Sequence, residues 1–406
     1  MAERAVDVAV VGAGIIGLGI AWTVAKSGRT VTVIDPDPAT GATYAAAGML
    51  APVSELHYQE EHLLELMLAS AELYPSFVES LGADAAEVGY RTTRTISVGA
   101  DAADRRSLAD LRGLQVAHGL AVEPLTVREA RALEPLLSPQ LSSAFNIEQD
   151  HQVDPRRLAD RLQVAIAVAA AEGNWIHDQA IRQNAVEILH ERPGDTASRV
   201  TGVALQDGSS VTAGEVIVAN GLAAARLRGL PDWLTLPLRP VYGDILRLRV
   251  PEHLRPLLTA TIRGLVRGLP VYLVPRSDGT VVLGATQRED GSAAVSVGGV
   301  YQLLRDAQVL VPAVAELELI EVTARARPGT PDNAPLLGRV TSGPRQPEGD
   351  IPGLIIATGF FRHGVLLTPI AAQHCLRLID GTADTRWARF RPDRFSPPTS
   401  KESARD

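Results

Sequence analysis

Apolar and polar residues are arranged at the start of the chain as in a strand, a turn, a helix and a second strand. Residues 6–11 form a short β-branched run, and the glycine-rich stretch 12–17 separates them from helix-forming residues that continue to Lys26. A second apolar run covers residues 30–34 and ends at Asp35. Runs of this length and order predict one βαβ unit, which belongs in a parallel sheet.

Apolar side chains recur at helical spacing in residues 60–81 and 153–171, and each segment is predicted to be a helix. In the second segment, Asp154 is a suitable N-cap and Pro155 suits the first helical turn. The Thr-x-x-Glu sequence of residues 126–129 has the spacing of a capping box, so it predicts the start of another helix.

Runs of strand length recur through the rest of the chain. They lie at residues 92–98, 200–205, 216–219, 245–250, 271–275, 281–285 and 354–357. Several alternate apolar and polar residues strictly, as residues 245–250 do, which is typical of an antiparallel sheet with one face exposed to water. Because the opening βαβ unit instead suits a parallel sheet, the chain is predicted to contain two domains.

The overall composition is that of an ordinary globular protein. The chain has 406 residues, of which 46% are hydrophobic and 21% charged, and its formal net charge is −8. No apolar run reaches the roughly 18 to 20 residues that cross a bilayer, so neither a membrane anchor nor a signal peptide is expected. The negative charge disfavours a nucleic-acid partner.

Cysteine and histidine usage narrows the chemistry further. Cys375 is the only cysteine, which excludes a disulfide within the chain and a structural zinc site built on several cysteines. It lies in an apolar helical segment and is predicted to be a core residue, and a reducing cytoplasm is the expected location. His57, His62 and His151 show no metal-ligand spacing, and His363 shows none either, so no metal site is predicted.

The first turn carries a nucleotide-binding pattern. Gly12-x-Gly14-x-x-Gly17 stands between the predicted strand and helix, with Asp35 at the end of the next strand. This is the dinucleotide fingerprint in its required context. The glycines bring backbone amides and a helix N-terminus against a diphosphate, and Asp35 is predicted to accept hydrogen bonds from a ribose. NAD and FAD share this fingerprint, so the motif alone leaves both cofactors open.

Two further segments favour a flavin. Residues 40–50 consist almost entirely of small residues, which suits a loop pressed against a flat ligand. Residues 354–359 form a buried strand ending in Thr-Gly, followed by residues 360–364 and an apolar helix that continues to Ile379. A second helix N-terminus supplied from the far end of the chain is how flavin sites stabilise negative charge on the reduced ring. Residues 216–221 have the same form and are predicted as a third strand of that sheet.

Together these motifs resemble the glycine oxidase and D-amino acid oxidase family of flavoproteins, over residues 5–390. The matching segments are residues 10–17, 45–50, 272–276, 284–286, 327–330 and 359–364. The resemblance implies non-covalent FAD and an α/β fold class with two domains: a Rossmann-like FAD-binding domain, and a discontinuous substrate domain on a mixed, largely antiparallel sheet.

The expected domains are each built from separate stretches of chain. The FAD-binding domain is predicted to comprise residues 1–90, 151–225 and 329–392. The substrate domain is predicted to comprise residues 91–150 and 226–328. Residues 393–406, which include several Pro and Ser residues, are predicted to be a disordered tail.

The resemblance also assigns the site residues. It implies that Arg327 binds both oxygens of a substrate carboxylate and that Tyr272 donates its hydroxyl to the same group, while Arg362 lies where it could fix the substrate or steady the reduced flavin. These three are the predicted catalytic and substrate-binding residues. The implied FAD contacts are Gly12, Gly14, Ile15, Ile16, Gly17, Asp35, Pro36, Ala42, Thr43, Ala47, Gly48, Met49, Phe360, Phe361, Arg362, His363, Gly364, Val365 and Leu366.

The activity implied by the resemblance is oxidative deamination of glycine or another small amino acid or amine. Hydride transfer to flavin N5 would give an imine, then glyoxylate and ammonia, with dioxygen reduced to hydrogen peroxide, and the imine would serve thiamin thiazole synthesis. A homo-oligomer is also implied. Alternatives are a D-amino acid or sarcosine oxidase or dehydrogenase, a tRNA-modifying flavoprotein, an NAD dehydrogenase and a non-catalytic nucleotide sensor.

Overall fold

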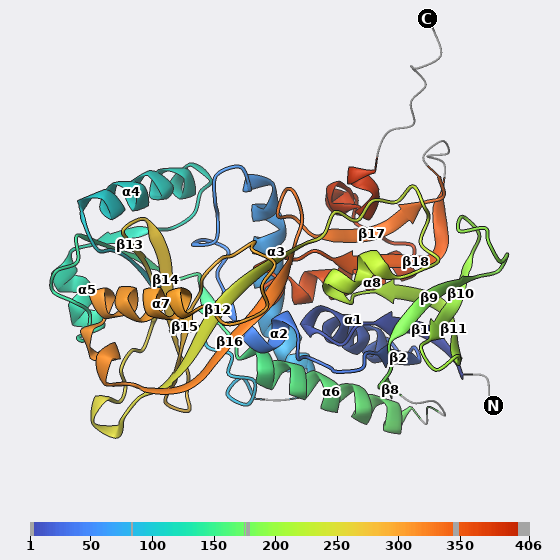
Figure 1. The fold of residues 1–406 in the computed structure, drawn as a ribbon, viewed down its shortest axis with the longest axis horizontal. Helices are drawn as coiled ribbons and strands as arrows, with labels where there is room; N and C mark the ends of the chain where they lie inside the picture. The colour runs from blue at the N-terminus through green and yellow to red at the C-terminus, as the bar shows by residue number, and fades with distance from the viewer. Residues whose placement is uncertain (1–3, 83, 174, 176–178, 344–348, 397–406) are drawn as a thin grey trace, which may run out of the picture. The chain divides into compact units, whose positions relative to one another are not determined.

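The computed structural model describes residues 4–82, 84–173, 175, 179–343 and 349–396 (Figure 1). They form two compact units. Unit 1 contains Met1–Thr43, Ala159–Pro240 and Arg327–Asp406, and unit 2 contains Tyr44–Leu158 and Val241–Ala326. The predicted α/β fold class with two multi-stranded sheets is confirmed.

Unit 1 is built on the sheet that contains the opening βαβ unit. Its strand order is β17 (Leu336–Thr341), β18 (Asp350–Thr358), β11 (Ser210–Val218), β1 (Arg4–Val11), β2 (Val31–Ile34) and β8 (Ala180–Ile181). β1 runs parallel to both β2 and β11, and β11 runs parallel to β18. The predicted third strand and the strand from the far end of the chain therefore lie in this sheet. β9 (Ala185–His190) and β10 (Val200–Leu205) extend it by antiparallel pairing onto β11.

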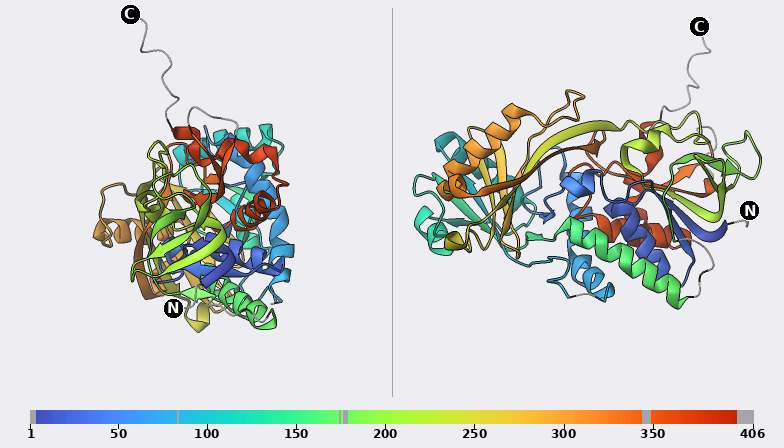
Figure 2. Two further views of the ribbon diagram at one scale, coloured as in Figure 1. Left: turned by 90° about the vertical axis from the view of Figure 1, so that its right-hand side faces the viewer. Right: turned by 60° about the horizontal axis from the view of Figure 1, so that its bottom comes forward.

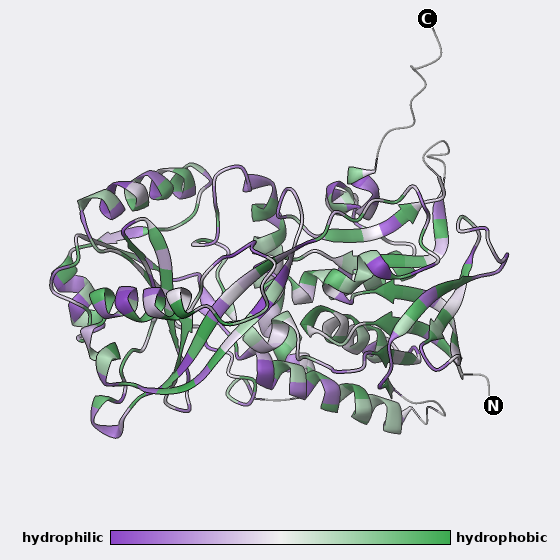
Figure 3. Cartoon of the chain, in the orientation of Figure 1, coloured by the Kyte–Doolittle hydropathy of each residue, from purple (hydrophilic) through white to green (hydrophobic). Residues whose placement is uncertain are grey.

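Helices cover the central strands of this sheet, so those strands are apolar on both faces, as parallel strands usually are. α1 (Ile15–Lys26) packs against α8 (Thr368–Ile379), and Figure 2 shows the two from other sides. The central strands are strongly hydrophobic in Figure 3, and residues 8–11 of β1 are almost completely buried. Cys375 of α8 is fully buried, as expected for a core residue.

His374 of α8 gives unit 1 a pH-dependent stability. The residue is 4% exposed, and burial lowers the pKa of its imidazole from 6.5 to about 4. Between these values the unfolded chain binds the proton and the folded chain does not, so stability falls as the pH falls from 6.5 towards 4. From pH 7 to pH 5, the free energy of unfolding should fall by about 1 to 2 kcal/mol less in His374→Gln than in the natural protein. Urea unfolding of both proteins at the two pH values measures this difference, and equal losses would contradict it.

Unit 2 is built on a mixed and largely antiparallel sheet, as predicted. The strand order is β16 (Glu318–Gly329), β12 (Arg239–Arg249), β15 (Thr280–Gly284), β14 (Leu269–Pro275), β13 (Thr261–Val266), β4 (Thr95–Gly99), β6 (Ser143–Ile147) and β5 (Glu123–Leu125). Only the β13 and β4 pair is parallel among the registers described for these residues.

The two faces of this sheet carry different side chains, and α7 (Val297–Leu310) packs on one of them. Ile96, Ile262 and Leu273 belong to a buried cluster that also includes Leu303 and Leu310 of α7. Side chains alternate along strands, so the intervening residues point to the opposite face. We call that opposite face, which carries Arg263, Tyr272, Val274, Ile245 and Arg247, the platform face.

The remaining helices start where the sequence indicates. α5 (Val127–Leu133) begins with the predicted capping box between Thr126 and Glu129. α6 (Pro155–Glu172) follows Asp154, whose carboxylate accepts the Arg156 backbone amide at 3.0 Å. The predicted helix at 60–81 is η1 (Glu61–Leu63) followed by α3 (Leu64–Ser80). α4 (Ala102–Ala117) was not predicted.

Three expectations differ from the structure. The chain first leaves unit 1 after Thr43 rather than after residue 90, because the segment that follows packs on the platform face of unit 2. Residues 245–250 do not have one wet face, since the Arg247 side chain is only 11% exposed. The predicted tail begins later, because Pro392–Phe395 forms a helical turn in which Arg394 bonds Asp332 at 2.9 Å. Residues 397–406 lie outside the described part.

Candidate functional site

The glycine-rich turn of unit 1 has no room for side chains at two of its glycines. Gly12 has φ of 107°, and a Cβ there would lie 2.6 Å from the Ala219 carbonyl oxygen. A Cβ on Gly17 would overlap the Gly12 carbonyl oxygen. Gly14 is the N-cap of α1 and has no side chain with which to cap the first amides of the helix. This arrangement fits a dinucleotide diphosphate.

Hydrogen bonds tie Asp35 and Thr43 to the same turn. One Asp35 carboxylate oxygen accepts the Ala13 amide at 2.7 Å, and the other accepts the Asp37 amide at 2.9 Å. The Ile15 amide donates to the Thr43 hydroxyl at 2.9 Å. Each carboxylate oxygen keeps a further lone pair, so Asp35 can still accept a hydrogen bond from a ribose. Of the other implied contacts here, Ile16 is buried, Ala42 is half-buried and Pro36 is exposed.

The structure brings the Arg327 strand end and the Arg362 turn together within unit 1. The Phe361 amide donates to the Pro328 carbonyl oxygen at 2.9 Å, and Phe361 has a φ of 46°. The guanidinium of Arg362 lies 5.2 Å from the Phe361 ring centre. The two predicted arginines therefore flank a single backbone contact.

A neighbouring glycine and arginine support this contact. Gly359 has φ of 73°, and a Cβ there would lie 2.7 Å from the Thr330 side chain. Arg239 donates to the Thr330 carbonyl oxygen, and its guanidinium lies 5.8 Å from the Phe361 ring centre. The turn then leads directly into α8. Its implied FAD contacts Phe360, Phe361, His363, Val365 and Leu366 are buried, whereas Arg362 and Gly364 are half-buried.

Tyr272 lies on the platform face of unit 2, in the middle of the sheet. It stands opposite Arg263 of β13 on one side and Gly284 of β15 on the other. A Cβ on Gly284 would overlap the Tyr272 hydroxyl, so the missing side chain at Gly284 makes room for the phenol. The ring packs in a small apolar cluster that includes Ala47 and Met49. Tyr272 therefore contacts the small-residue loop that was predicted to face a flavin.

Arginines of the platform face hold that loop at successive points. Arg247 of β12 donates to the Tyr44 carbonyl oxygen at 3.0 Å. Arg276, just after β14, donates to the Ala47 carbonyl oxygen. Arg263 of β13 approaches the Met49 sulfur at 3.9 Å. None of these three arginines was among the site residues predicted from the sequence.

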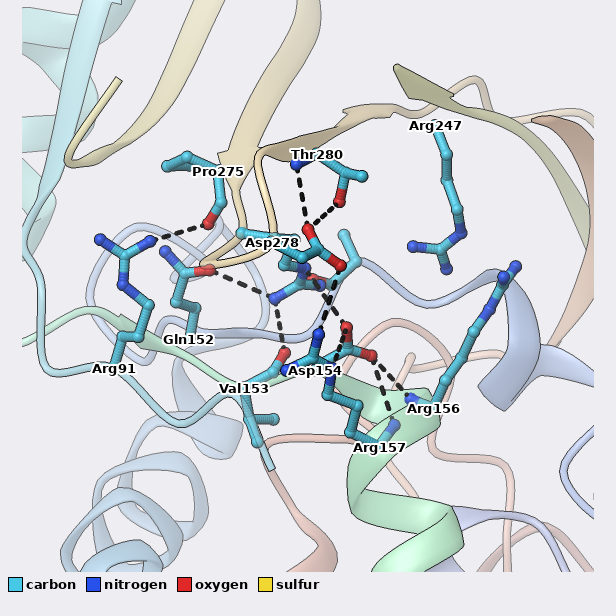
Figure 4. A network of polar contacts seen from close by, with 12 residues as sticks. Arg91, Gln152, Val153, Asp154, Arg156, Arg157, Arg247, Pro275, Asp278 and Thr280 are labelled. Carbon is cyan, nitrogen blue, oxygen red and sulfur yellow. Dashed lines mark hydrogen bonds and ion pairs between the residues drawn. The ribbon is translucent and has the colours of Figure 1, made fainter. Parts of the chain in front are cut away.

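Arg276 is the most deeply buried of the three. It is 8% exposed and also donates to the Val153 carbonyl oxygen at 2.8 Å and the Gln152 side chain at 3.2 Å. Burial lowers the pKa of Arg276 to about 10, which leaves the guanidinium protonated at neutral pH. Figure 4 shows Gln152 and Val153 in this network of polar contacts.

Backbone packing and pairing also hold the loop at Gly48. Gly48 has φ of 72°, and a Cβ there would overlap the Val153 carbonyl oxygen. The neighbouring residues pair as a short ladder between β3 (Met49–Leu50) and β7 (His151–Gln152). The loop that carries Ala47, Gly48 and Met49 is thus fixed by this ladder as well as by Arg276 and Arg263.

The far end of the loop is fixed by a buried carboxylate. The Asp150 oxygens accept the Val53 and Ser54 amides, each at 3.0 Å. Burial raises the pKa of Asp150 to about 6, although these hydrogen bonds and the charge of Arg263 act to lower it. At neutral pH the carboxylate is ionised and can accept both amides.

Tyr44, at the near end, is enclosed by charge. The Arg156 guanidinium lies 3.5 Å from the centre of its ring and forms two hydrogen bonds, of 2.7 and 3.0 Å, with the Glu321 carboxylate. The hydrogen bonds from Arg156 are the main cause that lowers the pKa of Glu321 to about 2.

The described residues contain neither a cluster of metal ligands nor a helix that could span a membrane. In this part of the chain, no group of three or more His, Cys, Asp or Glu side chains is placed to hold a metal ion. No helix there has both the length and the apolar character that crossing a bilayer requires.

Comparison with known proteins identifies the family. Residues 7–378 match the model of the DAO family, described as FAD dependent oxidoreductase. The chain belongs to this family. Its cofactor is therefore FAD, and the glycine-rich turn of unit 1 is a fitting cradle for the diphosphate of that cofactor.

Individual relatives cover nearly the whole chain. A glycine oxidase from Geobacillus kaustophilus is 33% identical, with 92% of this chain and 93% of that protein aligned. The crystal structure of glycine oxidase from that organism has a TM-score of 0.82 at 30% identity, covering 97% of this chain and 99% of that one. The bifunctional protein ThiO/ThiG of Synechocystis sp. is 32% identical over 97% of this chain. The chain spans only 55% of the length of that relative.

A further structural relative is named for a different substrate. The crystal structure of iminodiacetate oxidase from Chelativorans sp. has a TM-score of 0.78 at 27% identity, covering 95% of this chain and 98% of that one.

Proposed function

We propose that this FAD-dependent oxidoreductase oxidises glycine or another small amino acid at its α-carbon. The observation that carries the proposal is the backbone contact between Phe361 and Pro328, which joins the Arg327 strand end to the Arg362 turn. The glycine oxidases among the relatives, aligned over nearly their whole length, support this substrate class.

Each proposed residue has a distinct part in orienting the substrate. The planar Arg327 guanidinium can donate two parallel hydrogen bonds to the substrate carboxylate. The Tyr272 hydroxyl donates to the same carboxylate, and its position is set by the space above Gly284. Arg362 supplies positive charge at the turn, either to the substrate or to the reduced cofactor. Holding the substrate in one orientation accounts for much of the rate.

The cofactor would be held by the glycine-rich turn, Asp35, Thr43, the clamped loop 47–49 and the 360–366 turn. When bound, FAD accepts a hydride from the substrate and passes the electrons to dioxygen, giving hydrogen peroxide. The substrate amine is thereby converted to an imine, which water hydrolyses to an oxo acid and ammonia. With glycine the oxo acid is glyoxylate.

We also propose a physiological setting. The ThiO/ThiG relative supports a role in thiamin thiazole synthesis. A cytoplasmic location is proposed because the sequence has a single cysteine, whereas disulfides are typical of exported proteins. A homo-oligomer is proposed from the family resemblance.

The visible absorption spectrum of the purified protein, recorded without oxygen, tests the proposed function. We expect a yellow protein whose flavin absorption bleaches fastest with glycine, compared with separate samples given D-alanine or sarcosine. Bleaching by only a larger or N-methylated amine would reassign the substrate. Bleaching by glycine without subsequent oxygen consumption would point to a dehydrogenase. A colourless protein that binds no added FAD would contradict the proposal.

A further inference from the structure

An ion pair lies beside Tyr272 on the platform face, and the proposed function gives it no part. Arg263 of β13 pairs with Glu55, which follows the clamped loop 47–49 in sequence and is next to Ser54. The two side chains are 16% and 12% exposed, respectively. The role assigned to this pair rests on the proposed function, because Tyr272 is taken to be a substrate contact.

The register of the sheet places Arg263 next to Tyr272. Arg263 and Tyr272 are directly opposite each other on neighbouring antiparallel strands. Such residues point to the same face, with Cβ atoms about 4.5 to 5.5 Å apart. The phenol itself leans over Gly284, on the other side, but it is still close enough to act electrostatically on the Arg263 guanidinium. A second group on a substrate held by the Tyr272 hydroxyl would therefore come within the field of this cation.

Glu55 determines what that guanidinium can bind. Burial disfavours the charge of Arg263, but the Glu55 carboxylate outweighs burial and raises the pKa of Arg263 above its ordinary value. The guanidinium is thus charged and already paired. A substrate carboxylate would therefore gain little from this neutralised guanidinium, and displacing Glu55 would leave a largely buried carboxylate without its partner. Such a loss is strongly unfavourable.

We propose that Glu55 is a specificity-determining residue, which neutralises Arg263 and so makes the enzyme select amino acids without a second carboxylate. Removing the Glu55 charge breaks the ion pair and leaves Asp150 as the remaining carboxylate that acts on the Arg263 cation. The variant should then accept dicarboxylic ligands and substrates such as iminodiacetate.

Binding of two unreactive acids to the holoenzyme tests this proposal apart from turnover. Acetate and malonate are titrated separately into the natural protein and into Glu55→Gln, and each Kd is taken from the change in the flavin absorption spectrum. The natural protein is expected to bind malonate no more tightly than acetate. In Glu55→Gln the preference for malonate should rise by about tenfold or more, since the Arg263 charge, no longer paired with Glu55, then acts on the second carboxylate. The kcat/KM ratio of iminodiacetate to glycine should rise in parallel.

Matched variants separate specificity from damage to the fold. Glu318→Gln removes the same charge from an exposed pair with Arg249 in unit 2 and should leave the Kd ratio unchanged. The double variant Glu55→Gln/Arg263→Gln lacks both charges of the pair and should return the ratio to its natural value, even if one single variant folds poorly.

Two results would overturn the proposal. One is an unchanged ratio in Glu55→Gln, and the other is a natural protein that already prefers malonate tenfold. In either case glycine oxidation by the natural protein would leave the proposed function standing. A natural protein that neither oxidises glycine nor binds acetate would refute the proposed function itself.

Discussion

Gly17→Ala should purify as a protein without bound FAD. A Cβ at this position would overlap the Gly12 carbonyl oxygen, which belongs to the backbone and cannot swing aside as a side chain can. The turn must then open, and the first amides of α1 move away from the diphosphate that they would bind. We expect the Kd for added FAD to rise about 100-fold or more, which corresponds to roughly 3 kcal/mol. Fluorescence titration of the apoprotein with FAD measures it.

Gly113→Ala is the matched control for this prediction. Gly113 lies in α4 of unit 2, is exposed, and has no atom within 4 Å of a Cβ built on it. Its variant should bind FAD as the natural protein does. If Gly17→Ala also retained FAD with an unchanged spectrum, the glycine-rich turn would not be the diphosphate site.

Arg327→Ala should lose most of the activity while keeping the flavin. The guanidinium is proposed to bind both oxygens of the substrate carboxylate, and alanine would leave the charge of that carboxylate unpaired. We expect kcat/KM for glycine to fall about 1,000-fold or more, as sites built to bind a polar group do when the pairing is lost. Steady-state kinetics with oxygen consumption, together with the flavin content of the purified variant, measure both parts of the expectation.

Two other arginine variants sharpen this test. Arg327→Lys keeps the charge but lacks the planar fork, so its activity should lie between those of the alanine variant and the natural protein. Arg228→Ala removes an exposed guanidinium of unit 1, paired with Glu187 at 3.0 Å, and should leave kcat/KM unchanged. Loss of FAD from Arg327→Ala would instead assign this residue to the cofactor or the fold.

Local patterns predicted much of the chain correctly because their causes are local. The capping box of Thr126 and Glu129 needs only four consecutive residues, and the start of α6 needs only Asp154 and Pro155. The glycine-rich turn was equally recognisable, because the crowding at Gly17 comes from a carbonyl five residues earlier.

The arginines of the platform face could not be found in this way. Of the 39 basic residues, only Lys26 and Lys401 are lysines, so a single arginine carries little information. Arg263 and Glu55 are far apart in sequence, and only the tertiary packing of unit 2 brings them together. β13 itself escaped prediction, and it contains Gly264, where a Cβ would overlap Leu310. Amino-acid composition does not reveal such contacts.

The order in which the segments are joined has a consequence for synthesis on the ribosome. Unit 2 has all its residues once Ala326 has been made, whereas unit 1 still lacks β18, which lies between β11 and β17. The βαβ unit of residues 4–34, although made before unit 2, must wait until β18 has been made before its sheet can close. The nascent chain is therefore expected to complete unit 2 before unit 1, and to acquire its cofactor only after β18 has been made.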